Sequence, residues 1–233
     1  MNSVIEEFKN MFSFENVKWD AVIEATYETI YMTVIATIAA FIIGLIFGII
    51  LFLSNKSENV PSKPLYGTTS FIVNLFRAIP FIILIILLMP FTKAIMGTVM
   101  GSNGALPALI IGAAPFYARL VEIGLKEIDK GVIEAAESMG ANTWTIIWKV
   151  LIPESLPALI SGITVTSIML VGSTAIAGVI GAGGLGNLAY MVGFTRNQPD
   201  VTLVATVVIL IIVFVIQILG DFFSKRVDKR LSL

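Results

Sequence analysis

Six residues in the second half of the chain have the spacing of a phosphate-binding glycine loop. Gly181-x-Gly183-x-x-Gly186 matches the dinucleotide-binding fingerprint, and Asp200 follows at about the distance of a ribose ligand. That fingerprint needs a β-strand before it and a βαβ unit around it. Here the glycines follow an apolar stretch of 25 residues, and residues 155–195 carry no charge. We therefore interpret the glycine loop, residues 181–186, as irregular backbone between two membrane spans, forming a gate or a re-entrant turn.

The apolar stretch before the glycine loop contains small hydroxylated residues: Thr164, Thr166, Ser167, Ser173 and Thr174. Such residues commonly bring two helices into close contact. Alternatively, Ser173 and Thr174 face a wet, weakly polar passage for a solute. The candidate lining residues of that passage are Met169, Ser173, Thr174 and Ile176. Because this span has no charge, the sequence argues against a deep, high-affinity site in this chain.

Residue types exclude several other chemistries. The chain has no Cys and no His, which removes disulfides, Cys/His metal sites, haem ligation and a Ser-His-Asp triad. It has no GxxxxGK[ST] run, so it binds no ATP through a P-loop of its own. The 15 basic and 16 acidic residues give a net charge of -1, and no nucleic-acid partner is predicted. An intramembrane enzyme would need paired carboxylates or a Ser–His pair, and the span interiors offer neither.

The composition places the chain in a bilayer. Of its 233 residues, 57% are hydrophobic and only 13% are charged, whereas soluble domains are about 25% charged. The mean hydropathy is +0.93. About 20 apolar residues are needed for one span. The sequence predicts an all-α membrane protein with five transmembrane helices, at about Thr29–Leu53, Thr69–Met89, Ala105–Leu125, Leu156–Ile180 and Val201–Gly220.

Lysine and arginine counts predict the orientation of these spans. One set of loops carries ten basic residues and the other carries four, with Arg77 left out as intramembrane. The richer side is expected to be cytoplasmic, which places the N-terminus outside and the C-terminus inside a bacterial cell membrane. Residues 22–225 form one membrane domain, 226–233 a cytoplasmic tail, and 1–21 an extracytoplasmic segment. That segment has apolar residues at helical spacing, typical of a short interfacial helix.

Four further features suggest how the spans are shaped. Gly44-x-x-x-Gly48 is a close-approach pair for helix packing, and Gly97-x-x-x-Gly101 is either a second such pair or a loop. Pro80 and Pro115 are expected to kink the second and third spans. Arg77 is expected near the cytoplasmic end of its span, where its stem can snorkel. Arg119 and Glu122, spaced i,i+3, are expected to pair.

The most polar long stretch within the domain is residues 126–154, on the predicted cytoplasmic side. Val132, Ile133, Ala135, Ala136 and Met139 give a short helix an apolar face. Gly140 can end that helix in a left-handed conformation. Asn142 or Thr143 can then cap a second helix, carrying Trp144, Ile147 and Val150, which Pro153 is expected to stop. The pattern predicts a helix, a sharp turn and a helix, and leaves open whether the loop only packs under the membrane domain or docks a partner.

This loop resembles the signature loop of permease subunits of ABC-type importers. Glu134-Ala135-Ala136-x3-Gly140-x9-Val150-x-Ile152-Pro153 differs from EAA-x3-G-x9-I-x-L-P only by two exchanges among apolar residues of similar volume. The resemblance implies a type I importer architecture, in which the loop between spans three and four is a coupling helix seated on a cytoplasmic ATP-binding subunit. It implies a coupling role for Glu134, Ala135, Ala136, Met139, Gly140 and Ala141.

Further motifs resemble the permeases of the methionine-import branch of this family. They are residues 74–81 (NLFRAIPF), 97–98 (GT), 112–119 (GAAPFYAR), 138–141 (SMGA) and 181–186 (GAGGLG). The resemblance implies a homodimer, two ATP-binding subunits that bind ATP and Mg, and an extracytoplasmic lipoprotein that delivers L- or D-methionine. It implies no cofactor in this chain. The alternatives are a permease for another small amino acid or amine and a non-transporting membrane scaffold.

Overall fold

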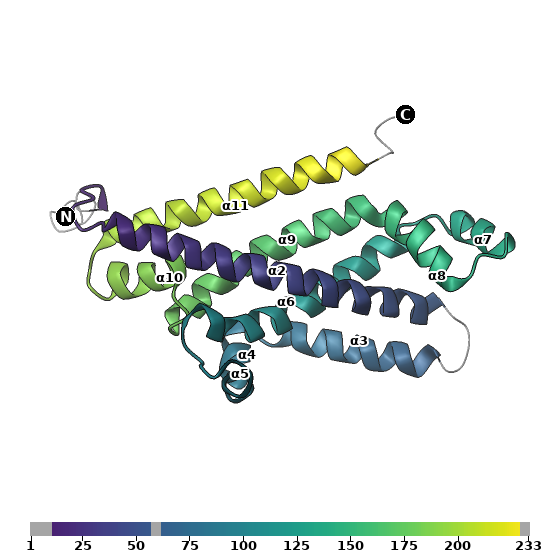
Figure 1. The fold of residues 1–233 in the computed structure, drawn as a ribbon, viewed down its shortest axis with the longest axis horizontal. Helices are drawn as coiled ribbons and strands as arrows, with labels where there is room; N and C mark the ends of the chain where they lie inside the picture. The colour runs from purple at the N-terminus through teal and green to yellow at the C-terminus, as the bar shows by residue number, and fades with distance from the viewer. Residues whose placement is uncertain (1–10, 57–61, 229–233) are drawn as a thin grey trace, which may run out of the picture. The chain divides into compact units, whose positions relative to one another are not determined.

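The structure is a computed structural model of the chain and describes residues 11–56 and 62–228. Every regular element in these two ranges is a helix (Figure 1). Four helical stretches in the described residues are long and apolar enough to cross a membrane. They contain α2 (Trp19–Lys56), α6 (Gly101–Lys126), α9 (Ile152–Val179) and α11 (Pro199–Val227). These helices confirm the first, third, fourth and fifth predicted spans.

The predicted second span is not one continuous helix. α3 (Ser62–Ala78) ends before Pro80, α4 (Phe81–Leu87) follows, and the two are bent by 105° at the break. Pro80 has φ -57° and ψ 135°, an extended conformation from which α4 starts. Proline lacks an N–H and disfavours helical geometry in the residue before it, so the helix breaks here. The kink predicted at Pro80 is therefore present, as a complete break of the helix within Thr69–Met89, and α5 (Met89–Met96) begins where the predicted span ends.

Pro115 behaves differently from Pro80, since α6 continues through it as one helix. Gly97 and Gly101 both have positive φ, 73° and 75°, and nothing lies within 4 Å of a methyl group built on either. They are turn residues between α5 and α6, not a packing pair, because only glycine adopts this conformation without strain. The predicted interfacial helix at the N-terminus falls largely on residues 1–10, outside the described part of the chain.

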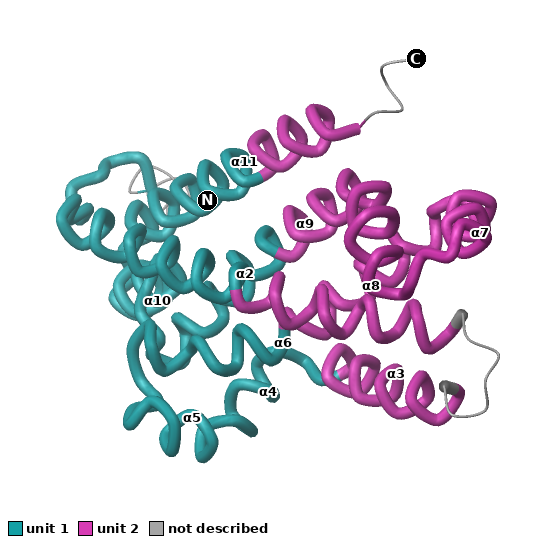
Figure 2. Tube along the Cα trace, turned by 45° about the vertical axis from the view of Figure 1, so that its right-hand side comes forward, with its two compact units in different colours: residues 1–38, 79–112, 167–216 teal, residues 39–78, 113–166, 217–233 magenta. Residues whose placement is uncertain are grey.

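The described chain divides into two compact units (Figure 2). Unit 1 comprises residues 1–38, 79–112 and 167–216, and unit 2 comprises 39–78, 113–166 and 217–233. Within unit 1, the N-terminal half of α2 packs against the glycine loop and the start of α11, in a core that includes Val22, Leu185 and Val201. Within unit 2, the C-terminal half of α2 packs on α6. Each unit thus has a hydrophobic core of its own.

The contact between α2 and α6 in unit 2 depends on the predicted glycine pair. A methyl group built on Gly48 would lie 2.5 Å from Cβ of Val121, and one on Gly44 would lie 2.8 Å from the carbonyl oxygen of Ala114. The two backbones therefore approach more closely than any larger residue would permit. This confirms Gly44-x-x-x-Gly48 as a packing motif.

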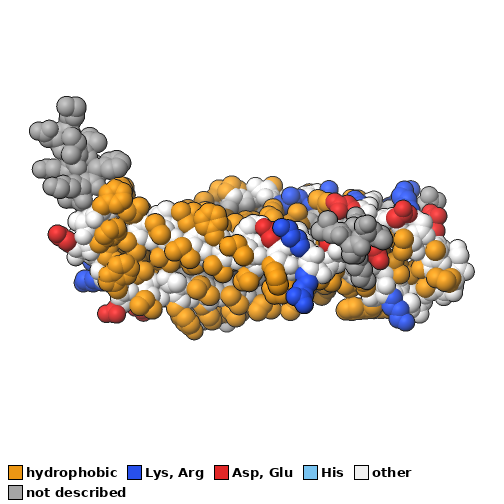
Figure 3. All heavy atoms as spheres, turned by 90° about the horizontal axis from the view of Figure 1, so that it is seen from above, with side chains coloured by type: hydrophobic (Ala, Val, Ile, Leu, Met, Phe, Trp, Pro, Cys, Tyr) orange, Lys and Arg blue, Asp and Glu red, His pale blue; other side chains and the backbone are white. Residues whose placement is uncertain are grey.

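Large apolar side chains are exposed along the long helices. On α11, Phe214 is 61% exposed and Ile218 is 66% exposed. Figure 3 shows hydrophobic side chains covering much of one face of the molecule, with charged side chains confined to a few places. A soluble protein rarely exposes so large a contiguous apolar surface. Contact with lipid explains this surface, as the composition predicted.

Candidate functional site

The first half of the predicted docking loop is α7 (Lys130–Ser138). Asp129 caps its N-terminus by accepting a hydrogen bond from the backbone N–H of Gly131 at 2.6 Å. Ile133 and Ala136 are 3% and 6% exposed, and they point into the core of unit 2. Glu134 and Ala135 are exposed. One face of this short helix therefore anchors the loop, and the opposite face is left to solvent or a partner.

The sharp turn after α7 forms as the sequence predicts. Gly140 has φ +79°, and nothing lies within 4 Å of a methyl group built on it, so its backbone conformation alone requires glycine. The backbone N–H of Met139 donates to the carbonyl of Ala135, and that of Ala141 donates to the carbonyl of Ala136, both at 3.1 Å. These bonds satisfy carbonyl groups that the end of the helix leaves without partners.

The second half of the loop begins with α8 (Thr143–Ile146). Of the two predicted caps, Asn142 serves: its side-chain oxygen accepts from the backbone N–H and from the hydroxyl of Thr145, both at 2.9 Å. The chain then passes through a π-helical turn, η1 (Ile147–Leu151), directly into α9. Pro153 does not stop the helix, contrary to the prediction. It occupies the second position of α9, where a missing N–H is tolerated, and the wide π turn before it accommodates its ring.

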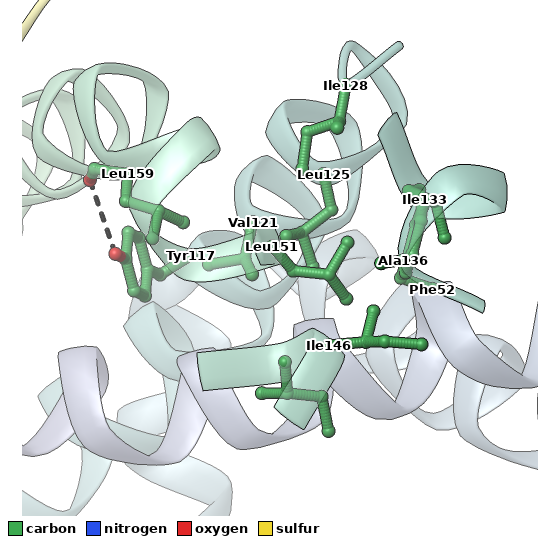
Figure 4. Packing of buried hydrophobic residues seen from close by; sticks show 11 residues of the cluster. Phe52, Tyr117, Val121, Leu125, Ile128, Ile133, Ala136, Ile146, Leu151 and Leu159 are labelled. Atoms are coloured by element: carbon green, nitrogen blue, oxygen red, sulfur yellow. Dashed lines mark hydrogen bonds between the residues drawn. The ribbon is translucent and has the colours of Figure 1, made fainter. Parts of the chain in front are cut away.

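The loop and the membrane helices of unit 2 share one hydrophobic core (Figure 4). Tyr117, Val121 and Leu125 enter it from α6, and Leu159 enters it from α9. Its other members come from α2, the loop and η1: Phe52, Ile128, Ile133, Ala136, Ile146, Ile147 and Leu151. Close-packed cores transmit displacements because they are not compressible. This shared core joins α7 to α6 and α9.

The outer face of the loop is apolar. Val132, Ala135 and Met139 are spaced i, i+3 and i+7 along α7, and all three are exposed, Met139 to 81%. Trp144 and Trp148, spaced i,i+4, are 70% and 61% exposed. The sequence predicted Trp144 on the second helix of the loop, without its exposure, and Trp148 was not singled out. We name these five residues the loop ridge. The sequence feature that could have predicted this exposed apolar surface is the pair of tryptophans close to the signature motif.

Five of the six predicted coupling residues are accessible or partly accessible. Glu134, Ala135, Met139 and Gly140 are exposed, and Ala141 is half-buried. Ala136 is buried in the core shared with α6. Ala136 therefore has a packing role on the buried face of α7. The other five predicted coupling residues lie close to the turn at Gly140.

The predicted passage residues on α9 fall into two groups. Met169 is half-buried and Ile176 is 40% exposed, and Gly172, also exposed, lies between them on the same helix face. Ser173 and Thr174 are 9% and 1% exposed, and their hydroxyl groups donate to the carbonyls of Met169 and Val171. The packing interpretation thus fits the two hydroxylated residues, while Met169 and Ile176 lie on a face that the described residues cover only in part.

The glycine loop is irregular backbone held by side chains of unit 1. Gly181, Gly183 and Gly184 all have positive φ. Glu28 Oε2 accepts from the backbone N–H of Gly184 at 2.6 Å, and Thr29 Oγ1 accepts from that of Leu185 at 2.9 Å. This agrees with the predicted irregular segment between two spans, and no strand lies before it in the described chain.

Asp200, the predicted ribose ligand of the rejected nucleotide site, is fully buried. Its Oδ2 atom accepts hydrogen bonds from the backbone and side-chain nitrogens of Asn16, at 3.0 and 3.1 Å. Its Oδ1 atom accepts from the backbone N–H of Val201. The carboxylate therefore anchors the segment before α2 to the start of α11, which is a structural role.

The charges on α6 form a three-residue cluster. Glu122 is completely buried; Arg119 Nη1 lies 2.6 Å from its Oε2 atom, and Lys126 Nζ lies 2.7 Å from its Oε1 atom. The predicted pair of Arg119 and Glu122 is confirmed, and Lys126, spaced i,i+4 from Glu122, is a third member that the prediction missed.

Arg77 is in the last turn of α3, before the break at Pro80. A cation at a helix C-terminus is stabilised by the helix dipole. Its guanidinium carbon also lies 5.9 Å from the ring centre of Phe116. Both contacts indicate a structural role.

Comparison with known proteins gives consistent matches. The family model described as "Binding-protein-dependent transport system inner membrane component" matches residues 40–233. The chain is 65% identical over 217 residues to the methionine import system permease protein MetP of Bacillus subtilis, covering 93% of this chain and 98% of that one. It is 45% identical over 212 residues to a probable D-methionine transport system permease protein MetI of Haemophilus influenzae, covering 91% and 100%.

The fold also matches a solved structure. A chain of the MetNI methionine ABC transporter, crystallised in inward-facing conformations, superimposes with a TM-score of 0.88 and 41% sequence identity. The match covers 92% of this chain and 99% of the other. The similarity therefore extends over nearly the whole chain.

Proposed function

Because the chain belongs to the family of binding-protein-dependent transport system inner membrane components, we propose that it is the permease of an ATP-driven importer that carries methionine into the cytoplasm. Relatives named as methionine import permeases match nearly the whole chain, which supports methionine over another small amino acid or amine. The absence of a P-loop assigns ATP hydrolysis to a separate subunit, which would bind ATP and Mg.

The observation that carries this proposal is the loop ridge. Val132, Ala135 and Met139 expose apolar surface on α7, while Ile133 and Ala136 on its other face join the core beneath. A short helix with an anchored face and an apolar outer face suits docking in a groove of another protein. Closure of two ATP-binding subunits would displace α7, and the shared core would pass this displacement to α6 and α9.

The arrangement of partners follows from the same proposal. The importer would contain a second copy of this chain, two cytoplasmic ATP-binding subunits on the loops, and a substrate-binding lipoprotein on the outer side. The excess of Lys and Arg in the loops that include residues 126–154 supports a cytoplasmic position for α7 and for the C-terminus, with the N-terminus outside.

The translocation route in this proposal runs along the exposed face of α9. Met169, Gly172 and Ile176 lie on that face, and a methyl group built on Gly172 meets nothing within 4 Å. The face is apolar and uncharged, so a zwitterionic amino acid would pass along it without being held tightly. Ser173 and Thr174 support it from behind, with their hydroxyl groups bonded to the carbonyls of their own helix.

Reconstitution of the permease with its ATP-binding subunit and binding protein in proteoliposomes tests both parts. We expect ATP-dependent uptake of methionine by the wild-type complex. Ala135→Asp and Met139→Asp, which place a charge on the loop ridge, should lower uptake and co-purification of the ATP-binding subunit by about tenfold or more. The matched variants Ala135→Ser and Met139→Leu should behave as wild type.

The proposed substrate and the proposed docking surface are contradicted by different results. If the wild-type complex shows no ATP-dependent methionine uptake, the proposed substrate is wrong. If uptake is normal in the two aspartate variants, the loop ridge is not the docking surface, and the coupling assignment is wrong.

A further inference from the structure

An open hollow of about 520 Å³ lies in unit 1 between α2 and the segment that leads into α6. From α2 it is lined by Glu24, Tyr27, Glu28 and Tyr31, which are spaced i, i+3, i+4 and i+7 and so share one helix face. The other wall is formed by Thr98 and residues 100–103. The functions assigned above use none of these side chains.

The lining complements an ammonium group. Glu24 and Glu28 are like charges at i,i+4, an arrangement that is unfavourable unless a cation lies nearby. The rings of Tyr27 and Tyr31 are stacked, with centres 6.5 Å apart and an interplanar angle of 19°. Aromatic faces attract ammonium cations, so the rings and the carboxylates favour the same group.

The opposite wall offers a donor for a carboxylate. The hydroxyl of Tyr31 donates to Oδ1 of Asn103 at 2.8 Å, which fixes the orientation of that amide. The amide nitrogen of Asn103 is a donor, and a donor is what the carboxylate of an amino acid requires. The hollow therefore presents acceptors on one wall and a donor on the other, as a zwitterion would need.

The same residues hold the glycine loop. Glu28 accepts from the backbone N–H of Gly184 at 2.6 Å, and the backbone N–H of Gly101 donates to the carbonyl of Gly181 at 2.9 Å. The Ser102 hydroxyl lies 3.4 Å from the carbonyl oxygen of Ala182. Three lining residues, Glu28, Gly101 and Ser102, thus bond directly to the glycine loop. A movement of these residues therefore alters the hydrogen bonds that hold the loop.

We propose that this hollow is an outer-side binding site for the ammonium group of the transported amino acid, and that Glu28 links its occupancy to the glycine loop. This rests on the proposed function and on the outward orientation of the N-terminal half of α2. An ammonium group that draws the Glu28 carboxylate into the hollow moves it away from the Gly184 N–H, to which its Oε2 atom is bonded. The loop then loses a charge-assisted hydrogen bond, and its positive-φ glycines can rearrange at low cost.

Equilibrium binding to the detergent-solubilised permease–ATPase complex, without the binding protein, tests the site. The probes are labelled methionine and, as competitor, 4-(methylthio)butanoate, which lacks the amino group. We expect saturable methionine binding that this competitor does not displace. Glu24→Gln and Glu28→Gln should each weaken binding about tenfold, since each removes a charged acceptor. Asp20→Asn, an equivalent charge removal near the start of α2 but outside the hollow, should leave binding unchanged.

Absence of binding, unchanged affinity in both glutamine variants, or equal displacement by the deaminated compound would overturn the proposal. Wild-type uptake in proteoliposomes is measured in parallel. If uptake occurs while the binding predictions fail, only this inference is wrong; if wild-type uptake is absent, the proposed function itself has failed.

The link to the loop has a separate readout. The chain has no cysteine, so Ala182→Cys places a single thiol in the glycine loop at a position only 4% exposed. Modification by a thiol reagent should be slow, and it should accelerate at least about fivefold when methionine is present. Adding Glu28→Ala should make it fast without methionine. Equal rates in all three conditions would show that Glu28 does not control the loop.

Discussion

The hydroxyl of Tyr117 on α6 donates a hydrogen bond to the carbonyl oxygen of Leu159 on α9 at 3.2 Å (Figure 4). Tyr117 is fully buried, and its ring also lies against that of Phe41 on α2, with ring centres 5.7 Å apart. One side chain therefore connects α2, α6 and α9 within unit 2, in the core that continues to α7.

Tyr117→Phe should lower the free energy of unfolding by about 1 kcal/mol, because it removes this bond and keeps the ring. The measurement is the unfolding of the purified chain in detergent, by heat or by denaturing detergent. Tyr190→Phe, at a ring that is 39% exposed, is the control and should change nothing. Equal stability of both variants would show that the Tyr117 hydroxyl contributes nothing to the contact.

Gly48→Ala should separate α2 from α6, because the added methyl group would overlap with Val121. We expect a loss of about 1–3 kcal/mol in the free energy of unfolding, the usual cost of overpacking. Gly67→Ala on α3 is the matched control, since nothing lies within 4 Å of a methyl group there. That substitution should be neutral or slightly stabilising. If Gly48→Ala unfolds like the control, the close approach is not required.

Loss of the two cations that pair with Glu122 should lower the free energy of unfolding non-additively. Arg119→Met or Lys126→Met alone leaves the buried carboxylate one cationic partner, and we expect less than about 1 kcal/mol of destabilisation from either. The double variant leaves the charge unpaired and should cost about 3–5 kcal/mol. A double-mutant cycle of unfolding free energies measures this difference. Additive losses would mean that the two cations do not share Glu122.

Four of the five spans could be predicted because a bilayer requires long apolar runs, and composition alone reveals them. For the second span the sequence predicted a kink at Pro80 but not the size of the bend, because the effect of a proline depends on its surroundings. Pro80 breaks the chain, Pro115 lies within a continuous helix, and Pro153 follows a π turn that receives it. Nothing in the local sequence distinguishes these three cases.

The outline of the docking loop could be predicted from the sequence, but not which of its faces is buried. The signature motif located the helix, the turn at Gly140 and the cap at Asn142. The sequence could not predict which apolar residues of α7 face inward, because both faces of this helix are apolar. Val132 and Ala135 lie on one face, and Ile133 and Ala136 lie on the other. For the same reason the charge-free α9 gave no indication that Ser173 and Thr174 are buried while Ile176 is exposed.

The π-helical turn at Ile147–Leu151 sets the rotational register of everything that follows it in α9. Such a turn holds one residue more than an α-helical turn. Removing one residue here would restore ordinary α geometry and leave each later side chain facing as it does, because the π turn absorbs one extra residue. Removing one residue from the first α-helical turn of α9 would instead rotate each later side chain by about 100° about the helix axis. Gly172 and Ile176 would leave the face they now occupy, without any substitution at either position. The number of residues in the α-helical turns after the π turn thus decides which surface α9 shows to its surroundings.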